Sequence, residues 1–378
     1  MMIKRCDEIL TIVFSLLMIA VCFSSCLKIE KVVDGASKEV ALSPVASVMT
    51  KQIPGPVLGT TYSENETMGI ISYKSETAAG VPWIDDPDTD TDNPELYING
   101  VEFLFKDYAN AWAGATPQYW PETGSLIFAG YSPYYRLRDK DTPVPVQNVS
   151  YDPATRTLSI PDYSVGWYEA MTQEEIQNEN FVYRNVAQSD LMFFLPKIDE
   201  NGKHVGVNRL ASYDACFNHA LSLVEFTVAA EDTDAINRID LSSIILKSVY
   251  YQGDFSAKAD DEGAVTVTWG DLRSAEDVNV FLADDDAQVG LLLFLKPRTI
   301  AQLLVIPGPT HEIQVHYHVF VNGKEYEQYA EFTPEQLNLT EWLPGKKYVY
   351  NLVLGVDKLT FSTQTERWED TQSGATIQ

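Results

Sequence analysis

The sequence predicts an all-β protein, and three observations support that prediction. Short apolar or alternating runs recur along the chain, and clusters of Gly, Pro, Asn and Asp separate them. Period-2 alternation is clear at 265–269, 313–319 and 358–362, which is typical of strands with one buried and one solvated face. Helical signals are few and short. The expected strands are 68–74, 101–105, 125–131, 190–196, 220–229, 264–269, 290–296, 301–306, 312–321, 325–332, 346–354 and 358–363.

Two short helical segments are expected among these strands. Thr172 and Glu175 form a capping box for a helix over 172–179. Thr333 precedes Pro334 at a first helical position, which predicts a turn or two of helix there. Neither segment is long enough to organise a domain.

The composition limits the class of protein. The chain has 378 residues, of which 45% are hydrophobic and 21% charged, a globular composition long enough for two domains. Its net charge of −27 argues against nucleic acid as a partner, because binding phosphates requires clustered Lys and Arg. Only four Cys occur, so a disulfide scaffold is excluded.

Residues 1–25 have the pattern of a secretory signal peptide. The apolar run at 9–23 is too short to span a bilayer, but it has the length of a signal h-region. Ser24 and Ser25 then precede Cys26, an arrangement that resembles the lipobox of bacterial lipoproteins. This resemblance implies a lipoprotein signal peptide, cleavage before Cys26 and acylation of the Cys26 thiol. The alternative is an ordinary signal peptide with an incidental Cys.

The remaining chain divides into three parts. Residues 26–52 form an N-terminal linker with one candidate strand near 40–42. A polar, Gly-containing segment at 199–214 separates two strand-rich halves. We therefore expect an N-terminal β-sandwich at 53–205 and a C-terminal β-sandwich at 206–378.

The sequence indicates no catalytic residue, no cofactor and no assigned metal ligand. The G-x-S-x-G elbow, the P-loop and the G-x-G-x-x-G fingerprint do not occur. His316 and His318 share a strand face and could hold a metal weakly, but an ordinary solvated pair is the favoured interpretation. The acidic loop 85–92 lacks the spacing of an EF-hand, so we interpret it as solvated and leave loose Ca²⁺ binding open. Cys216 lies in an apolar run and is expected to be a small buried hydrophobe.

Six short motifs are spread in order through nearly the whole mature chain. They are Trp120-Pro121 with SLIFAGYSPY at 125–134, Asp190-Leu191-Met192, FNHALS at 217–222, Val305-Ile306-Pro307, WLPGKKYVYNL at 342–352, and Trp368. Together they resemble the motifs of fimbrillin-like proteins, the type V pilus subunits of anaerobic Gram-negative bacteria. Gly130 and Ser132 depart from the spacing of that family's A-Y-Y-P-Y core.

Two of these motifs also make local structural predictions. Pro344-Gly345 predicts a type II turn in which Gly345 takes a positive φ. The strand that follows should present one apolar face, formed by Tyr348, Tyr350, Leu352 and Leu354. In the FNHALS motif, His219 is expected to pack or hydrogen-bond near the start of a strand.

The resemblance implies two tandem transthyretin-like β-sandwich domains without an active site. It also implies strand exchange, in which a protease removes an exchangeable N-terminal strand and the groove left behind accepts a strand from another subunit. Family stalk subunits are cut after an Arg, but no Arg occurs between Cys26 and Arg136. Lys51 is the closest equivalent. Either a Lys-tolerant protease cuts after Lys51, or the subunit stays uncut as an anchor or accessory component.

The expected function is therefore that of a non-enzymatic fimbrial subunit at the cell surface. Its partners would be the outer membrane, through the lipid at Cys26, and other fimbrial subunits, with adhesion to a host or bacterial surface ligand left open. Two other interpretations remain. A lipid-anchored glycan-binding β-sandwich would use exposed aromatics among the 20 Tyr and 7 Trp for sugar stacking. A secreted hydrolase without a recognisable motif would use two of the many carboxylates.

Overall fold

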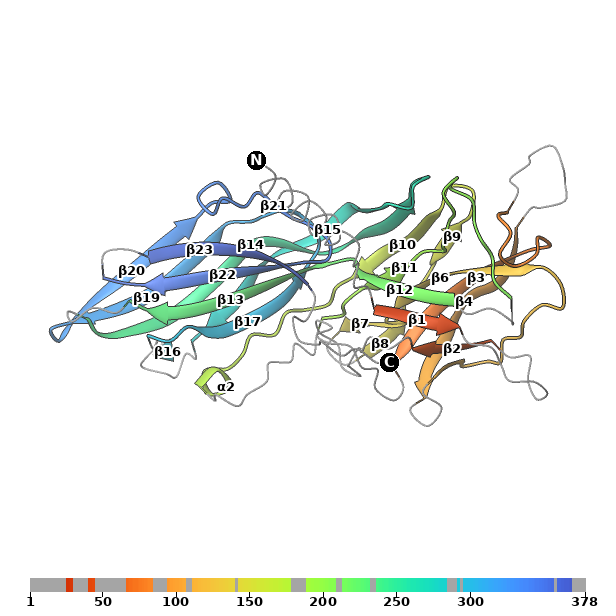
Figure 1. The fold of residues 1–378 in the computed structure, drawn as a ribbon. Helices are drawn as coiled ribbons and strands as arrows, with labels where there is room; N and C mark the ends of the chain where they lie inside the picture. The colour runs from red at the N-terminus through yellow and green to blue at the C-terminus, as the bar shows by residue number, and fades with distance from the viewer. Residues whose placement is uncertain are drawn as a thin grey trace, which may run out of the picture.

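The protein is built almost entirely of strands, arranged in two lobes along one long axis (Figure 1). The computed structural model describes residues 25–29, 40–44, 66–83, 94–106, 111–139, 142–177, 188–208, 213–231, 236–283, 291–292, 295–356 and 359–368. The one helix among them is α2 (Gln173–Gln177), so the predicted all-β class is confirmed. Within the described part of the chain, no helix has the length and apolarity needed to cross a membrane.

Eight strands of the N-terminal lobe are hydrogen-bonded in a cyclic order. In that order they are β1 (Ser25–Ile29), β12 (Tyr213–His219), β11 (Met192–Phe194), β6 (Ser125–Ser132), β3 (Thr67–Ser75), β4 (Glu95–Lys106), β5 (Ala111–Gly114) and β2 (Ala41–Pro44). Because β2 also pairs with β1, we call this sheet the ring. An apolar cluster, the ring core, fills it and consists of Val40, Met68, Ile70, Ile98, Phe103, Phe105, Trp112, Trp120, Leu126, Phe128, Met192, Phe194 and Phe217.

Strand β6 buries both of its faces. Leu126 and Phe128 belong to the ring core, whereas Ile127, Ala129 and Tyr131 belong to a second cluster. This alternation follows from the period of two along a strand. The second cluster, the central core, also includes Leu158, Ile160, Leu191, Phe193, Leu223, Phe255, Ala257, Leu304, Ile306 and Trp368.

One long strand, β14 (Ile236–Ala259), connects the two lobes. Its first half pairs with β19 (Ile313–Val321), and its second half pairs with β10 (Thr157–Ser164). The other strands of this sheet are β20 (Lys324–Phe332), β9 (Ser150–Asp152), β15 (Val265–Leu282) and β16 (Leu291–Leu292). Sheet hydrogen bonding is therefore continuous from one lobe to the other. The domain boundary expected between residues 205 and 206 stays a prediction.

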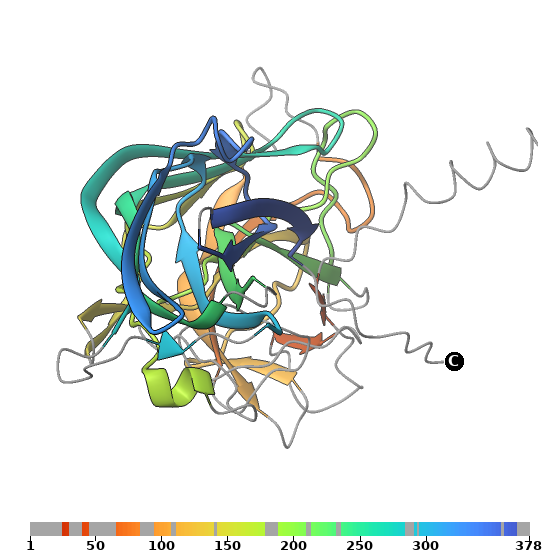
Figure 2. The ribbon, with the colours of Figure 1, turned by 90° about the vertical axis from the view of Figure 1, so that its left-hand side faces the viewer.

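The C-terminal lobe is a two-layer sandwich. Its second sheet contains β17 (Arg298–Val305), β13 (Ser222–Ala230), β22 (Lys346–Leu354) and β23 (Leu359–Arg367), with β13 parallel to β22. Seen end-on, the strands of this lobe curve around a common interior (Figure 2). That interior, the C-terminal core, includes Val224, Phe226, Ile244, Val280, Leu303, Val315, Tyr317, Tyr348, Tyr350, Leu352 and Leu354. The predicted apolar faces of 313–319 and 346–354 are thus confirmed.

Short elements complete the lobes. The pairs β7 (Tyr135–Asp139) with β8 (Thr142–Pro145) and β18 (Gly308–Pro309) with β21 (Glu341–Trp342) form two small sheets. The capping box is present, since the Thr172 N–H donates to Oε2 of Glu175 at 2.8 Å and the Glu175 N–H donates to Oγ1 of Thr172 at 3.3 Å. The segment after Thr333 forms a single turn, in which the Leu337 N–H donates to the Thr333 carbonyl at 3.1 Å.

Candidate assembly site

The N-terminal segment, by which we mean the chain from β1 to Lys51, completes the ring through its two strands. Strand β1 lies antiparallel between β12 and β2, and Cys26 is opposite Cys216 in the register. Strand β2 lies antiparallel to β5, with Leu42 opposite Trp112. The segment therefore supplies two adjacent strands that fill the space between β12 and β5. The sequence predicted only one strand in this segment, near 40–42.

Residues at both ends of β2 explain its position. Val40, directly before the strand, is completely buried in the ring core. Its backbone N–H donates to the carbonyl of Gln118 at 2.6 Å, which attaches the segment to the connection between β5 and β6. Pro44 ends the strand, as expected for a residue that has no N–H to donate to a ladder.

The strands that flank the segment carry aromatic side chains of the ring core. Trp112 on β5 is buried, and its ring centroid lies 5.5 Å from that of Phe105. Phe217 on β12 is also buried, and its ring lies 5.1 Å from Phe194, nearly edge to face. Full burial of one such side chain stabilises a fold by about 1.5–3 kcal/mol. Burial of these aromatic side chains therefore favours the closed ring.

Loss of residues 26–51 would change this geometry in two ways. Strands β12 and β5 would each lose a neighbour and present unpaired N–H and C=O groups. The ring core would open to water beside Trp112 and Phe217. A sheet edge next to an apolar groove is suited to bind an extended segment, because the backbone supplies hydrogen bonds and alternate side chains fill the groove.

Most of the predicted site residues fall outside the part of the chain that the structure describes. Cys26 is placed by its backbone in β1, and Cys216 by its backbone in β12, but their side chains lie outside the described residues. Lys51 and the acidic loop 85–92 lie outside them entirely. Acylation at Cys26, cleavage after Lys51, Ca²⁺ binding by the loop and burial of the Cys216 thiol therefore stay predictions.

Three of the six sequence motifs meet where the lobes join. His219 ends β12, and its Nδ1 lies 3.0 Å from Oδ2 of Asp190, whose side chain is buried. The His219 ring stacks on Trp368, with ring centroids 4.0 Å apart and planes 10° apart. His219 thus packs and hydrogen-bonds three residues before β13 begins at Ser222, which confirms the expected position near the start of a strand. Nothing in the sequence indicated that Asp190 and Trp368 would be its partners.

A fourth motif attaches to the same place. The Gly345 N–H donates to the carbonyl of Leu221 at 2.8 Å, and the Ser222 hydroxyl donates to the carbonyl of Leu343 at 2.8 Å. Gly345 has φ of 64°, which confirms the predicted positive φ. We call Asp190, His219–Ser222, Leu343–Gly345 and Trp368 the motif junction. Its contacts are ring stacking between side chains and hydrogen bonds among side chains and backbone. Four of the six motifs therefore supply residues that pack together where the two lobes join.

The departure at Gly130 also has a packing reason. A Cβ added there would lie 2.3 Å from Cε1 of Phe194, because that ring fills the space a side chain would need. Phe194 is one of the fully buried residues of the ring core. Because Gly130 has no side chain, the Phe194 ring can pack directly over the backbone of β6 at this position.

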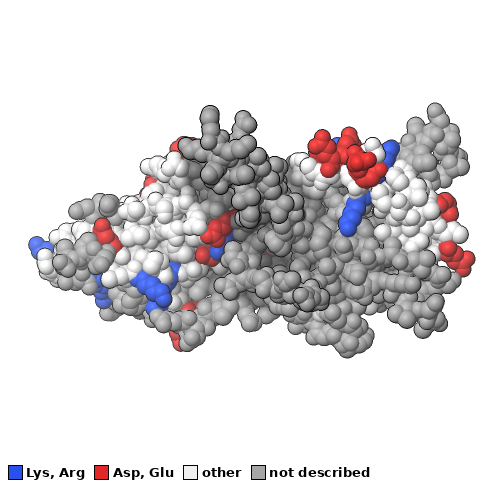
Figure 3. Space-filling view, in the orientation of Figure 1, with Lys and Arg blue, Asp and Glu red and all other residues white. Residues whose placement is uncertain are grey.

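On the face that Figure 3 shows, acidic side chains gather at the tip of the β14–β15 hairpin. Asp260, Asp261 and Glu262 are all exposed there. Arg156 pairs with Asp261 and donates through Nη1 to the carbonyl of Gly202 at 2.7 Å. The described residues contain one group of His, Cys, Asp and Glu that could hold a metal ion, and it lies on β19 and β20, away from this tip.

The fold and the candidate site define a class: a two-lobed β-sandwich protein whose own N-terminal segment completes a sheet. A family model described as fimbrillin-like matches residues 61–368. The chain belongs to the fimbrillin-like family, which confirms the resemblance carried by the six motifs. Membership supports a fimbrial or adhesion-related subunit at the cell surface.

Solved structures of low sequence identity are similar to this chain. A candidate cell adhesion protein from Bacteroides uniformis is 15% identical, with 85% of this chain and 98% of that chain covered and a TM-score of 0.40. A fimbrial protein from Bacteroides vulgatus is 10% identical, with coverage of 80% and 92% and a TM-score of 0.42. The tip fimbrial protein Mfa3 from Porphyromonas gingivalis is 10% identical, with coverage of 81% and 95% and a TM-score of 0.25. No curated protein matches the chain in sequence.

Proposed function

We propose that this protein is a lipid-anchored fimbrial subunit or accessory component that assembles by donor-strand exchange, in which the place of its N-terminal segment is taken by a strand of a neighbouring subunit. The observation that carries the proposal is the position of β1 and β2, which complete the ring between β12 and β5. Family membership supports the fimbrial role. After cleavage, an extended segment of a neighbouring copy would have to take the place of β1 and β2 between β12 and β5.

The anchoring part of the proposal concerns Cys26. Acylation of its thiol would hold the mature chain in the outer membrane, since more than one acyl chain gives stable attachment. Cells expressing Cys26→Ala should lose incorporation of a labelled fatty acid into this protein. Cys216→Ala is the matched control and should keep the label. Unchanged labelling of Cys26→Ala would contradict lipid anchoring.

The exchange part of the proposal concerns Lys51. Limited trypsin treatment of the mature chain should release the segment that ends at Lys51 and produce ladders of high mass on mildly denaturing gels. Lys51→Gln should abolish the ladders, because β2 then stays attached even where trypsin cuts after an earlier Lys. Lys38→Gln removes a Lys earlier in the same segment and should leave the ladders unchanged. Monomers alone after clean cleavage at Lys51 would count against exchange.

The native N-terminus decides between two roles within this proposal. An N-terminus at acylated Cys26 favours an anchor or accessory component, which keeps β1 and β2 in its own ring. An N-terminus at Gln52 favours a subunit of the fimbrial shaft, which accepts a segment from a neighbour. Mass spectrometry of protein isolated from cells distinguishes the two directly.

A further inference from the structure

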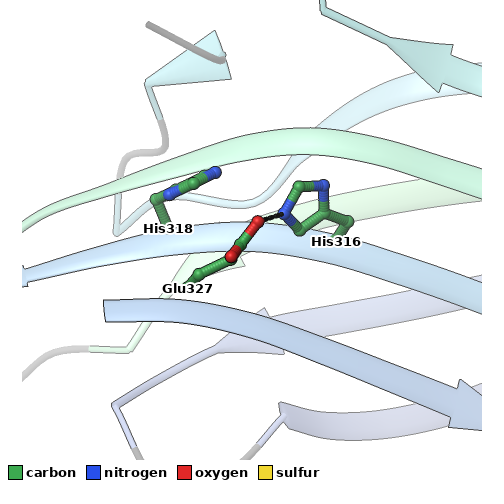
Figure 4. Close-up of side chains that lie close together, drawn as sticks. All are labelled: His316, His318 and Glu327. Atoms are coloured by element: carbon green, nitrogen blue, oxygen red, sulfur yellow. Dashed lines mark hydrogen bonds and ion pairs between the residues drawn. The ribbon is translucent and has the colours of Figure 1, made fainter. Parts of the chain in front are cut away.

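Two imidazoles and one carboxylate meet on the outer face of the β19–β20 hairpin. Val315, Tyr317 and Val319 point into the C-terminal core, so His316 and His318 lie on the opposite face of β19. Glu327 on β20 is directly opposite His318 in the antiparallel register. One donor atom from each of these three side chains lies within 4.8 Å of the other two (Figure 4).

The distances suit a small metal ion. The Nε2 of His316 lies 3.0 Å from Oε1 of Glu327. In a tetrahedral zinc site, metal–ligand distances of about 2.0–2.2 Å place neighbouring donor atoms about 3.3 Å apart. The separation of 3.0 Å between His316 and Glu327 is close to that value, and all three donors lie within 4.8 Å of one another, so rotations of these side chains would bring them around one ion. The fourth position would face solvent, because Glu327 is about half exposed.

Neighbouring groups orient these side chains. The Nδ1 of His318 lies 2.8 Å from Oε1 of Glu325 without hydrogen-bond geometry, so a small rotation of the ring would let Nδ1 engage Glu325 while Nε2 binds a metal. The Tyr329 hydroxyl donates to Oε1 of Glu327 at 2.5 Å. The Tyr329 ring also stacks on His316, with centroids 4.2 Å apart and planes 5° apart. Such partners around the ligands fix ring orientation and raise metal affinity.

We propose that His316, His318 and Glu327 bind a divalent first-row transition-metal ion. Two imidazole nitrogens and one carboxylate oxygen form a donor set that suits Zn²⁺, Ni²⁺ and Cu²⁺, whereas Ca²⁺ and Mg²⁺ prefer oxygen ligands only. The site lies on two strands joined by a tight turn, so the ligands come from one rigid hairpin. The proposal does not depend on acylation or strand exchange.

Calorimetric titration of the mature full-length chain with Zn²⁺ tests this proposal. We expect one specific site per chain, and Co²⁺ should give the visible absorption of a tetrahedral complex. His316→Gln, His318→Gln and Glu327→Gln should each remove the specific site. Glu325→Gln, which alters only a ligand's partner, should weaken affinity by about 10–100-fold. Mg²⁺ should not compete.

Glu331→Gln is the matched control for the carboxylate. Glu331 lies on the same strand, opposite Gln314, and the substitution removes the same charge outside the triad. It should leave Zn²⁺ affinity unchanged. Because the chain is strongly acidic, diffuse binding of cations is the competing explanation. Equal Zn²⁺ binding by wild type and the double variant His316→Gln/His318→Gln, with an unchanged far-UV spectrum, would overturn the proposal.

Discussion

Replacing Phe255 with Ala tests whether the lobes are one cooperative unit. Phe255 lies in the second half of β14, and its side chain is 2% exposed. Its ring lies 5.2 Å from Phe193 on β11 and 5.4 Å from Trp269 on β15, measured between centroids. The substitution therefore opens a cavity in the central core, to which strands of both lobes contribute.

The expected cost follows from this burial. Phe→Ala in a close-packed core destabilises a protein by about 3–5 kcal/mol, through lost burial and the cavity left behind. Since each 1.4 kcal/mol is a factor of ten, the unfolding equilibrium constant should rise by roughly two to three and a half orders of magnitude. Leu223 and Leu304 of the C-terminal lobe belong to the same core, so the loss should reach that lobe too.

Native-state amide hydrogen exchange measures this loss in each lobe separately. The most protected amides of β6 and of β19 should lose the same free energy of opening in Phe255→Ala. Tyr326→Ala, which removes an exposed ring on β20, is the control and should change it by less than about 0.5 kcal/mol. A loss confined to β6, or a total loss below about 1 kcal/mol, would refute the reasoning.

Two further predictions concern a turn and a carboxylate. Gly345→Ala should destabilise the protein by about 1–2 kcal/mol, because an L side chain at φ of 64° is strained while the added Cβ meets no atom nearer than 3.6 Å. An unchanged urea midpoint would show that this turn is not strained. The Asp199 carboxylate accepts N–H bonds from Lys203 at 2.8 Å and Asn201 at 2.9 Å, and the Lys203 bond is the main cause of its lowered pKa. Its stabilisation is complete above the unfolded pKa of about 3.9 and is lost as the pH falls through the lower folded value. Asp199→Asn should therefore make the urea midpoint fall less steeply on acidification below about pH 4, and a wild-type profile would contradict this.

Strands with an uninterrupted period of two, or with a continuous apolar run, could be predicted from the sequence. The segments expected at 125–131, 312–321 and 346–354 correspond to β6, β19 and β22, nearly residue for residue. In each, the local pattern and the tertiary environment agree, because one face or both faces enter a core. Burial on both faces of β6 also explains why its sequence is a continuous apolar run.

The longest strand was missed because its buried face changes parity. In β14 the register shifts at several points, among them near Ser243 and near Ser248, where φ is 54°. These two irregularities turn the following residues to the other face. The buried apolar side chains are consequently Ile239 and Leu241, then Ile244 and Leu246, then Val249, Tyr251, Phe255, Ala257 and Ala259. No single period describes this list, so only the pairing with β19, β15 and β10 reveals one strand.

Only two of the three proposed metal ligands, His316 and His318, could be placed together from the sequence, for a related reason. The alternation of β19 placed His316 and His318 on one face, and the structure agrees. Glu327 joins them only because the β19–β20 register sets it opposite His318. That register depends on the turn at Asn322-Gly323, where both residues have positive φ. A cross-strand ligand cannot be assigned from the spacing within one strand.

The N-terminal strands show the same limit and explain why exchange is physically reasonable. Strands β1 and β2 are short, and their partners β12 and β5 lie far away in the sequence, so tertiary pairing determines where they form. The other six strands of the ring remain joined in the order β12-β11-β6-β3-β4-β5 without them. Each of the two new edges would keep its inner neighbour, so the gap should retain its shape after the segment leaves. A preformed gap lowers the ordering cost of binding a new segment, which favours replacement by another copy over collapse of the ring.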